Sequence, residues 1–564
     1  MKRHLWLVIL CIQALALNAA QYIEQKPLRD VVKTPVRSYT RNGPADQLPI
    51  ITWGGDIATI FGNGSATNTA PNSIFAKQGL NFRLVRQDVF TNQLVGYMGG
   101  QSPYLRVTLG MLNQAAELLN QDPRTRPVTV YQMTWSSGGD VLVVKSGINS
   151  IEDLRGKTIV IQAYGPHLDL LTTILKRGNL SPTDVTIKYV KDITGTDNTP
   201  GAAFRQDPNV HAAFVISPDA KELVSGDKAV RGARSLFSTL TANQAIPDVY
   251  VCSQEYFESH RGEVEKFVHA LLLAEEQVAR IMKDPARKPE LDRLLPASAL
   301  MLLDTKDMTE DVKGLYADCT FVGYPGNVKF FNDPTFPRGF LALNSEIQQA
   351  FMKLNILKST VLLEHGVLNY DDLKQGLFNT SMAEAPRFQP EAVAQFVAKK
   401  TAAGTLGAAA VVTFEVKFPP NKQTFDAEAY KEDFERVIEL ATTYAGAIIS
   451  IEGHSDPTGY VDAAKTNAPD AVLKRIAQSG RNLSLSRAAA VRQAVLDYAS
   501  NVKKHTLDSS QFGVSGVGFS NPKTGMQNGI PVRPDSEEKF LSNMRAVFRL
   551  VPVEAEASVF TPAK

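Results

Sequence analysis

The stretch that decides how this 564-residue chain is organised is Gly453-His454-Ser455-Asp456-Pro457-Thr458-Gly459. Two further pieces follow it: residues 483–488 read Leu-Ser-Leu-Ser-Arg-Ala, and residues 543–547 read Asn-Met-Arg-Ala-Val. The first piece supplies a carboxylate, Asp456, and the second a guanidinium, Arg487. A carboxylate accepts hydrogen bonds from an ammonium group, and an arginine donates two parallel bonds to a carboxylate. Held close together, the two residues suit a zwitterionic ligand; an ordinary surface salt bridge between them is the alternative.

In this order, the three pieces resemble the peptidoglycan-binding domain of the OmpA family, which the Pal and MotB proteins also contain. The resemblance covers roughly residues 411–551. It implies a compact α+β domain of order βαβαββ that binds the diaminopimelate of peptidoglycan. It also implies that Asp456 accepts from the ligand ammonium, that Arg487 donates to its carboxylate, and that Arg545 supports them.

This region departs from the family pattern in two places. Gly480 stands where the family usually has an asparagine, three residues before the Leu-Ser pair. Residues 461–481 form a longer run than usual, as if a short helix were inserted. Both departures bear on affinity more than on fold.

Strand-like and helix-like segments alternate through the larger N-terminal part. Such alternation favours parallel α/β sheets with both faces covered by helices. The helix expected over residues 263–283 is amphipathic, with apolar side chains recurring at helical spacing. Strands are expected at 49–53, 80–85, 128–133, 141–144, 157–161, 211–216 and 249–251.

The motifs of this part are similar to those of type II periplasmic solute-binding proteins of the nitrate, sulfonate and thiamine-precursor group. The resemblance rests on residues 49–55 (Pro-Ile-Ile-Thr-Trp-Gly-Gly), 136–144, 148–157 and 180–185. It implies two α/β lobes that close on a ligand by a hinge motion. One lobe would comprise residues 47–136 and 255–375, and the other residues 137–250, with the hinge near 135–141 and 248–255.

Three loops that follow strand-like runs are candidates for the ligand site. Strand ends and helix N-termini offer free N–H groups to anions, and glycine lets the backbone approach a ligand closely. We therefore expect a small, anionic or zwitterionic ligand. Ordinary turn chemistry is the alternative for each loop, and a purely structural role is the alternative for the histidine. The candidate residues are Trp53, Gly54, Gly55, Asp56, Ser136, Ser137, Gly138, Tyr164, Gly165 and His167.

The N-terminus predicts export to the periplasm. Met1-Lys2-Arg3 is followed by an apolar run over residues 5–17 and by Asn18-Ala19-Ala20, the pattern of a secretory signal peptide. An uncleaved anchor is the alternative. Removal of residues 1–20 takes away two of the 60 basic residues and leaves 58 against 58 acidic ones. No net field then favours nucleic acid.

Two cysteines remain in the mature chain, Cys252 and Cys319. An even pair in an oxidising compartment predicts a disulfide, with two buried thiols as the alternative. The expected organisation is a signal peptide (1–20), an extended lead-in (21–46), the binding-protein-like domain (47–380), a linker (381–410), the OmpA-like domain (411–552) and a tail (553–564).

No enzyme motif stands out. The chain has no His-Glu-x-x-His, no Cys-x-x-Cys and no Walker A run, so no catalytic residue, metal or cofactor is expected. The sequence predicts a periplasmic solute-binding protein tethered to peptidoglycan, which presents a small molecule to an inner-membrane transporter or sensor. The alternative is an envelope interaction module whose binding-protein fold no longer takes a ligand.

Overall fold

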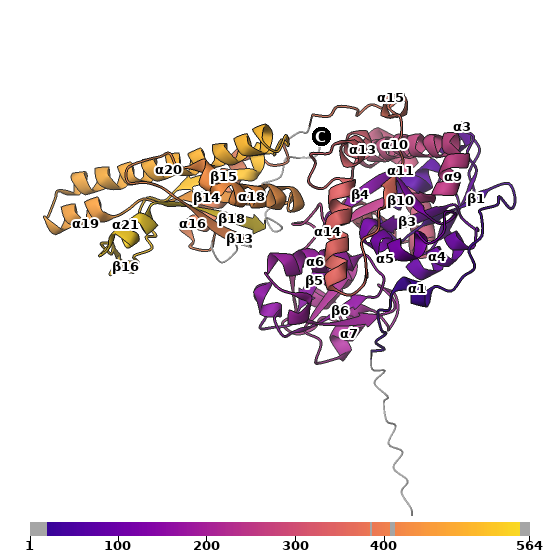
Figure 1. The fold of residues 1–564 in the computed structure, drawn as a ribbon, viewed down its shortest axis with the longest axis horizontal. Helices are drawn as coiled ribbons and strands as arrows, with labels where there is room; N and C mark the ends of the chain where they lie inside the picture. The colour runs from indigo at the N-terminus through magenta and orange to yellow at the C-terminus, as the bar shows by residue number, and fades with distance from the viewer. Residues whose placement is uncertain (1–19, 384–385, 407–411, 553–564) are drawn as a thin grey trace, which may run out of the picture.

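The computed structural model describes residues 20–383, 386–406 and 412–552. Almost all of the expected signal peptide, and the tail over 553–564, lie outside the described residues. The chain forms a large N-terminal part of two lobes and a smaller C-terminal domain beside it (Figure 1). None of the described helices is both long enough and apolar enough to span a membrane.

The first lobe is built on a sheet of order β11-β4-β10-β3, with β12 added to β4. All residues of β4 and β10 are buried, because helices cover both faces of these strands. The strands are β1 (Asp46–Ile50), β2 (Phe82–Arg86), β3 (Tyr104–Thr108), β4 (Pro127–Ser136), β10 (Pro247–Ser253), β11 (Cys319–Phe321) and β12 (Glu364–His365). The helices are α2 (Asp56–Gly62), α3 (Ile74–Lys77), α4 (Phe90–Met98), α5 (Leu109–Leu119), α9 (Gln254–Ser259), α10 (Arg261–Lys283), α11 (Lys288–Leu303), α12 (Thr309–Ala317), α13 (Gly323–Asn332), α14 (Phe340–Lys353) and α15 (Tyr370–Leu373).

The second lobe has a sheet of order β7-β6-β8-β5-β9. Strand β6 runs parallel to β7 and β8, whereas β5 runs antiparallel to β8 and β9. In the first lobe β10 is likewise antiparallel to both of its neighbours. The expected all-parallel sheets are therefore mixed. The elements are β5 (Asp140–Val144), β6 (Thr158–Gln162), β7 (Thr186–Val190), β8 (Ala212–Ile216), β9 (Arg234–Ser238), α6 (His167–Arg177), α7 (Pro200–Gln206) and α8 (Ser217–Ser225).

Two connections join the lobes. The first runs from β4 to β5 over residues 137–139, as expected. The second runs from β9 to β10 over residues 239–246, so the expected boundary at residue 250 and the expected hinge at 248–255 are wrong. Strand β10 belongs to the first lobe because it pairs with β3 on one side and β4 on the other. A short apolar run does not reveal which of two sheets it enters.

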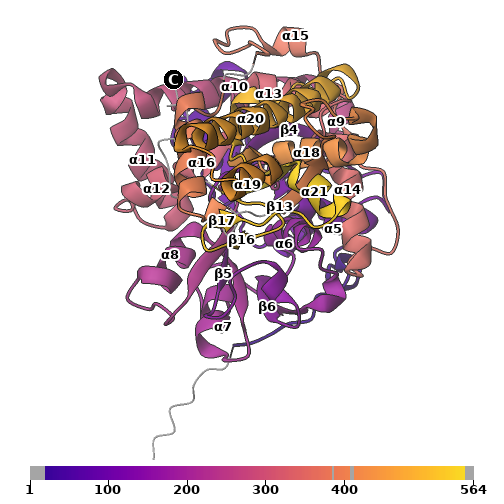
Figure 2. The same ribbon diagram turned by 90° about the vertical axis from the view of Figure 1, so that its left-hand side faces the viewer.

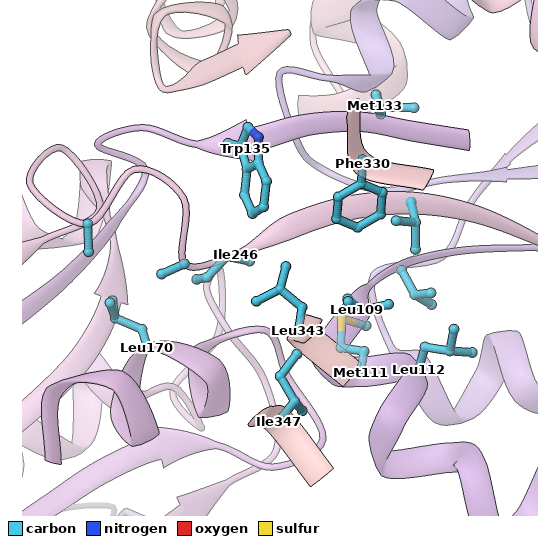
Figure 3. Packing of buried hydrophobic residues seen from close by; sticks show 14 of the residues in the cluster. Leu109, Met111, Leu112, Met133, Trp135, Leu170, Ile246, Phe330, Leu343 and Ile347 are labelled. Carbon is cyan, nitrogen blue, oxygen red and sulfur yellow. The ribbon is translucent and has the colours of Figure 1, made fainter. Parts of the chain in front are cut away.

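Apolar side chains from both lobes meet beneath the cleft between them. Leu170 of α6 comes from the second lobe, whereas Leu109, Trp135 and Leu343 come from the first, with Ile246 on the connection between them (Figure 3). These buried residues belong to one continuous core. The two lobes therefore pack directly against each other around the hinge.

The lead-in is mostly extended, as expected, with one short helix, α1 (Leu28–Val31). It contacts both lobes. Ile23 forms a β-bridge with Tyr189 of the second lobe, and Arg37 donates its backbone N–H to Met98 of the first. We call residues 20–45 the N-terminal strap, because they run across the junction of the two lobes.

The C-terminal domain has a sheet of order β13-β18-β14-β15. Its main elements follow in the expected order βαβαββ. Helices α18 and α20 pack together, and α20 lies against β14 and β15. The elements are β13 (Val412–Lys417), α18 (Lys431–Thr443), β14 (Ala447–Gly453), α19 (Thr458–Lys465), α20 (Asp470–Asn501), β15 (Phe512–Gly516), the hairpin β16 (Met526–Gln527) and β17 (Ile530–Pro531), α21 (Glu537–Asn543) and β18 (Arg545–Pro552).

The expected linker is wrong over much of its length. Residues Pro390–Ala402 form helix α16, whose Val393, Phe396 and Val397 pack on Ile448 of β14. Ile448 and its neighbour Ile449 point to opposite faces of the sheet, so α16 covers the face that α18 and α20 leave open. Small residues among the apolar positions hid this pattern in the sequence. Residues 384–385 and 407–411 lie outside the described part.

The insertion after the first motif is larger than expected. It comprises α19 and the first part of α20, which begins at Asp470. Together these segments extend away from the sheet at the end of the domain far from the two lobes (Figure 1).

The C-terminal domain contacts the second of the two connections between the lobes, residues 239–246. Gln244 donates its backbone N–H to Thr443, and Gly446 donates to Thr241, both at 3.3 Å. The ring of Tyr444 packs edge-on against that of Phe237, with 6.0 Å between centroids. The domain therefore contacts the N-terminal part beside the hinge, and it lies in front of that part in the end-on view (Figure 2).

Candidate functional sites

A cavity of about 370 Å³ lies between the two lobes. The three loops expected from the sequence all reach it, through Trp53, Ser136, and Tyr164 with Gly165. Trp53 and Ser136 come from the first lobe, whereas Tyr164 follows β6 of the second. The structure therefore brings together loops that are far apart in the chain, Trp53 and Tyr164 by more than a hundred residues, and bulky side chains do not fill the space between them.

Trp53 lies where the two lobes meet. Its indole Nε1 donates to Thr134 Oγ1 at 3.2 Å, which fixes the ring against β4. A Cβ atom added to Gly139 would lie 2.3 Å from that ring. Glycine at 139 is therefore needed for the connection between the lobes to pass the tryptophan.

Ser136 and His167 are linked through Asp140. Ser136 Oγ donates to Asp140 Oδ2 at 2.6 Å, and His167 Nε2 lies 2.7 Å from Asp140 Oδ1. His167 is fully buried and does not line the cavity, although Asp140 does. The expected contact of His167 with a ligand is therefore replaced by a contact with the Asp140 carboxylate behind the cavity wall.

Five other candidates, Asp56 among them, do not line the cavity. A Cβ atom at Gly54 would lie 1.9 Å from the carbonyl oxygen of Leu315, and one at Gly55 would lie 2.6 Å from Met133 Sδ. Both glycines therefore allow close packing within the first lobe. Ser137 shares a hydrogen bond with Thr320, and Gly138 adopts φ of 122°, which favours glycine.

Asp56 belongs to a buried charge cluster under the cavity. Arg106 lies 2.9 Å from Asp56 and 2.7 Å from Asp248, and all three side chains are buried. Burial raises the pKa of Asp56 to about 7, in spite of the Arg106 guanidinium. Burial also raises the pKa of Asp248, which lines the cavity. One guanidinium thus serves two carboxylates.

Sequence reasoning missed part of the cavity wall. Ile23 and Val31 of the N-terminal strap line it, as do Val89 and Phe90 at the start of α4 and residues 191–194 after β7. The start of α4 follows strand β2, so the argument from strand ends could also have identified it as part of the site. The N-terminal strap could not be identified in this way, because its sequence shows no hydrophobic periodicity and no strand is expected before it.

The expected disulfide is wrong, and both cysteines are free. Cys252 of β10 pairs with Val128 near one end of β4, whereas Cys319 of β11 pairs with Ser136 at the other end. Eight residues of extended strand separate these positions, about 26 Å. A disulfide needs Cα atoms within about 7 Å.

In the C-terminal domain, Arg487 is a buried cation. Its guanidinium donates to the backbone carbonyls of Lys422, His454 and Pro419 and lies over the ring of Phe418. Burial lowers the pKa of Arg487 to about 10. No carboxylate of a described residue pairs with Arg487, so the alternative of a salt bridge with Asp456 is not seen.

Asp456 is half-buried at the end of β14. It accepts from the backbone N–H of Thr458 at 2.8 Å and from Asn543 Nδ2 at 2.9 Å. Asn543 was quoted in the sequence motif but was not expected to hold the acid. Both donors are neutral, so the Asp456 carboxylate can still pair with a cationic group of a ligand.

His454 connects this acid loop to both arginines. Its carbonyl accepts from Arg487, and its backbone N–H donates to the carbonyl of Arg545 at 2.8 Å. Arg545 is itself buried, donates to the carbonyl of Asn521 and lies 3.5 Å from Glu415. Burial lowers its pKa. The fold thus gathers Asp456, Arg487 and Arg545 around one loop.

The comparisons with known proteins concern the N-terminal part. Residues 107–287 match the family model described as NMT1/THI5 like. A comparison with curated proteins found no match.

Several solved structures match this part of the chain at low sequence identity. The aliphatic sulphonate binding protein SsuA of Escherichia coli is 15% identical; the match covers 62% of this chain and 96% of that one, with a TM-score of 0.41. SsuA of Xanthomonas axonopodis pv. citri bound to MOPS is 15% identical, over 58% and 100%, with a TM-score of 0.39. The nitrate-binding protein NrtA of Synechocystis PCC 6803 is 11% identical, over 57% and 91%, with a TM-score of 0.34.

The N-terminal part has a periplasmic-binding-protein-like α/β fold. Its two mixed sheets, joined by two connections with a cavity between them, define that class. The family-model match falls on residues 107–287, which include the whole second lobe and both connections.

Proposed function

We propose that this protein is a periplasmic solute-binding protein held to the cell wall. In this proposal the lobes of residues 46–373 close on a small organic molecule, and residues 386–552 bind the diaminopimelate of peptidoglycan. The observation that carries the first half is the convergence of three loops from two hinged lobes on one cavity. Its volume of about 370 Å³ falls within the range of small-molecule sites.

The charge arrangement around the Asp456 loop supports the second half. Arg487 is a buried cation whose only partners among the described residues are carbonyls and an aromatic ring. A buried cation without a counter-charge is costly, and a ligand carboxylate would offset that cost. Asp456, held by neutral donors, would accept from the ligand ammonium. This pairing of one acid and one arginine suits diaminopimelate.

Sedimentation with purified peptidoglycan tests wall binding. We expect the full chain to sediment with it, and Asp456→Asn and Arg487→Lys to weaken the interaction by about 2 kcal/mol or more. Asp456→Asn leaves the ligand ammonium without a counter-charge, and Arg487→Lys removes the two parallel donors to the ligand carboxylate. Asp497→Asn and Arg436→Lys change exposed residues of the same domain and serve as matched controls. If the wild type and the four variants all sediment equally, Asp456 and Arg487 do not form the binding site.

A ligand of the cleft would be delivered to a membrane partner, a transporter or a sensor. Mass spectrometry of the molecules released on denaturing the purified protein tests whether the cleft is used. A bound molecule in near-stoichiometric amount supports the proposal, whereas an empty protein that no small-molecule library stabilises against heat contradicts it.

A further inference from the structure

The charged side chains that line the cleft are mostly acids. They are Asp88, Asp140, Asp192, Asp248 and one basic residue, Lys191. Sulfonate and nitrate ions would have to enter this site against an excess of carboxylates. The charge of the lining therefore bears directly on the class of ligand.

The cations behind these acids are shared. Arg106 pairs with Asp248 and also with Asp56, and Arg86 lies 3.4 Å from Asp88 and 2.6 Å from Asp304. None of these arginines lines the cavity. The positive charge of each arginine is therefore already paired with carboxylates of the protein.

Three charged residues of the lining remain. Asp140 accepts from Ser136 and lies 2.7 Å from His167 Nε2, and Lys191 and Asp192 are neighbours after β7. Lys191 is exposed, and its carbonyl accepts from the Gln162 side chain. Asp192 is half-buried and accepts from Thr196 Oγ1 at 2.8 Å. An exposed lysine is screened by water, so it does not offset the acids deeper in the cleft.

Buried acids around the cleft also raise one another's pKa. The Asp140 carboxylate contributes to the raised pKa of Asp248, Asp169 and Asp318, after the larger effect of burial. These directions show that several acids lie close together beside the cavity.

Helix N-termini are the feature that would favour an anion, and they do not reverse this balance. An N-terminus carries about half a positive charge. At α5 the N–H of Gly110 already donates to Asp169, and that of Met111 donates to Thr108. Asp169 lies in the first turn of α6 and offsets that terminus too. Helices α2 and α8 also begin beside the cavity, and they carry Asp56 and Asp219 in their first turns. The start of α4 has no acid in its first turn.

The rest of the wall combines apolar and aromatic side chains with neutral polar ones. Rings of tryptophan and tyrosine attract cations over their faces. An apolar body with a single charged nitrogen would therefore match both parts of the wall. The apolar lining includes Trp53, Phe90, Met111, Tyr164, Ile216 and Ile246.

We propose that the cleft binds an organic monocation, a protonated amine on an aromatic or branched aliphatic body, in place of the anionic or zwitterionic ligand expected from the sequence. This inference rests on the proposed solute-binding function. The ammonium group would lie near Asp192 and Asp140, and the apolar body against Trp53 and Tyr164.

A matched pair of probes tests the ligand class. 2-Phenylethylamine and 3-phenylpropionate carry the same ring on chains of similar length but have opposite charges at pH 7. We expect the amine to bind the full mature chain at least tenfold more tightly, by calorimetry and by the rise in melting temperature. Asp192→Asn should weaken amine binding about fivefold or more. Asp197→Asn changes an exposed acid of the same loop that does not line the cavity, and it should leave binding unchanged.

The outcomes separate this inference from the function on which it rests. Equal binding of both probes, or tighter binding of the carboxylate, overturns the cationic ligand and leaves the solute-binding function standing. If neither probe binds at 10 mM and denaturation releases no small molecule, the proposed function itself fails.

Discussion

Asp169 in the second lobe accepts a hydrogen bond from the backbone N–H of Gly110 in the first, at 3.1 Å. A Cβ atom at Gly110 would lie 1.6 Å from Asp169 Oδ1. Beside this contact, Gln114 Nε2 donates to the carbonyl of Gly165. Helices α5 and α6 therefore meet across the cleft only because residue 110 is glycine.

We expect Gly110→Ala to hold the lobes apart. The added methyl group overlaps the Asp169 carboxylate, so this contact must open or shift, at a cost of about 1–3 kcal/mol. Hydrogen exchange should then rise at the backbone of residues 108–114 and 164–170. Gly262→Ala is the control, because a Cβ atom there meets open space. Unchanged exchange in Gly110→Ala would show that the lobes are not held by this contact.

Gly446→Val should release the C-terminal domain from the hinge connection. A Cβ atom at Gly446 would lie 1.8 Å from the carbonyl oxygen of Leu240, which is backbone and does not move aside easily. We expect a larger radius of gyration in small-angle X-ray scattering, with both domains folded. Gly459→Val serves as control, because nothing lies within 4 Å of its Cβ position. Identical scattering of the two variants would mean that the interface tolerates the side chain or does not form.

The stability of the N-terminal part should depend on Asp56 between about pH 4 and pH 7. The folded protein raises the pKa of Asp56 from 3.8 to about 7, so in this window the folded state keeps a proton that the unfolded state loses. Stability therefore falls as pH rises through the window. Relative to Asp56→Asn, which stays neutral, the wild type should lose free energy of unfolding from pH 4.5 to pH 7.5.

Urea unfolding followed by tryptophan fluorescence measures this difference. Trp53 and Trp135 are the only tryptophans after residue 20, so the signal reports on the N-terminal part alone. A wild type that instead gains stability over the variant as pH rises would show that Asp56 is ionised throughout.

Thiol labelling should find two free cysteines in the mature chain. Cys252 is fully buried and burial raises its pKa, so it should react slowly in the native protein. After denaturation without reductant, both Cys252 and Cys319 should react completely. If fewer than one thiol per chain is labelled, Cys252 and Cys319 form the disulfide after all.

Local sequence patterns were enough to place most strands and the long helix α10. Apolar runs such as 211–216 and the helical spacing over 263–283 depend only on nearby residues, and they are confirmed. The pieces around Asp456, Arg487 and Arg545 predicted a shared site, and the fold gathers them around one loop. Helix α16 was not predicted, because small residues lie among its apolar positions.

By itself, the sequence determined the order of most elements, the two-part organisation and three of the loops that face the cleft, because these follow from periodicity and from residues at strand ends. Only the tertiary structure decided that β10 belongs to the first lobe, that His167 binds Asp140, that the two cysteines stand at opposite ends of β4, and that acids outnumber cations in the cleft. Each of these depends on contacts between residues far apart in the chain, and burial and charge pairing are set by those contacts rather than by neighbours in sequence.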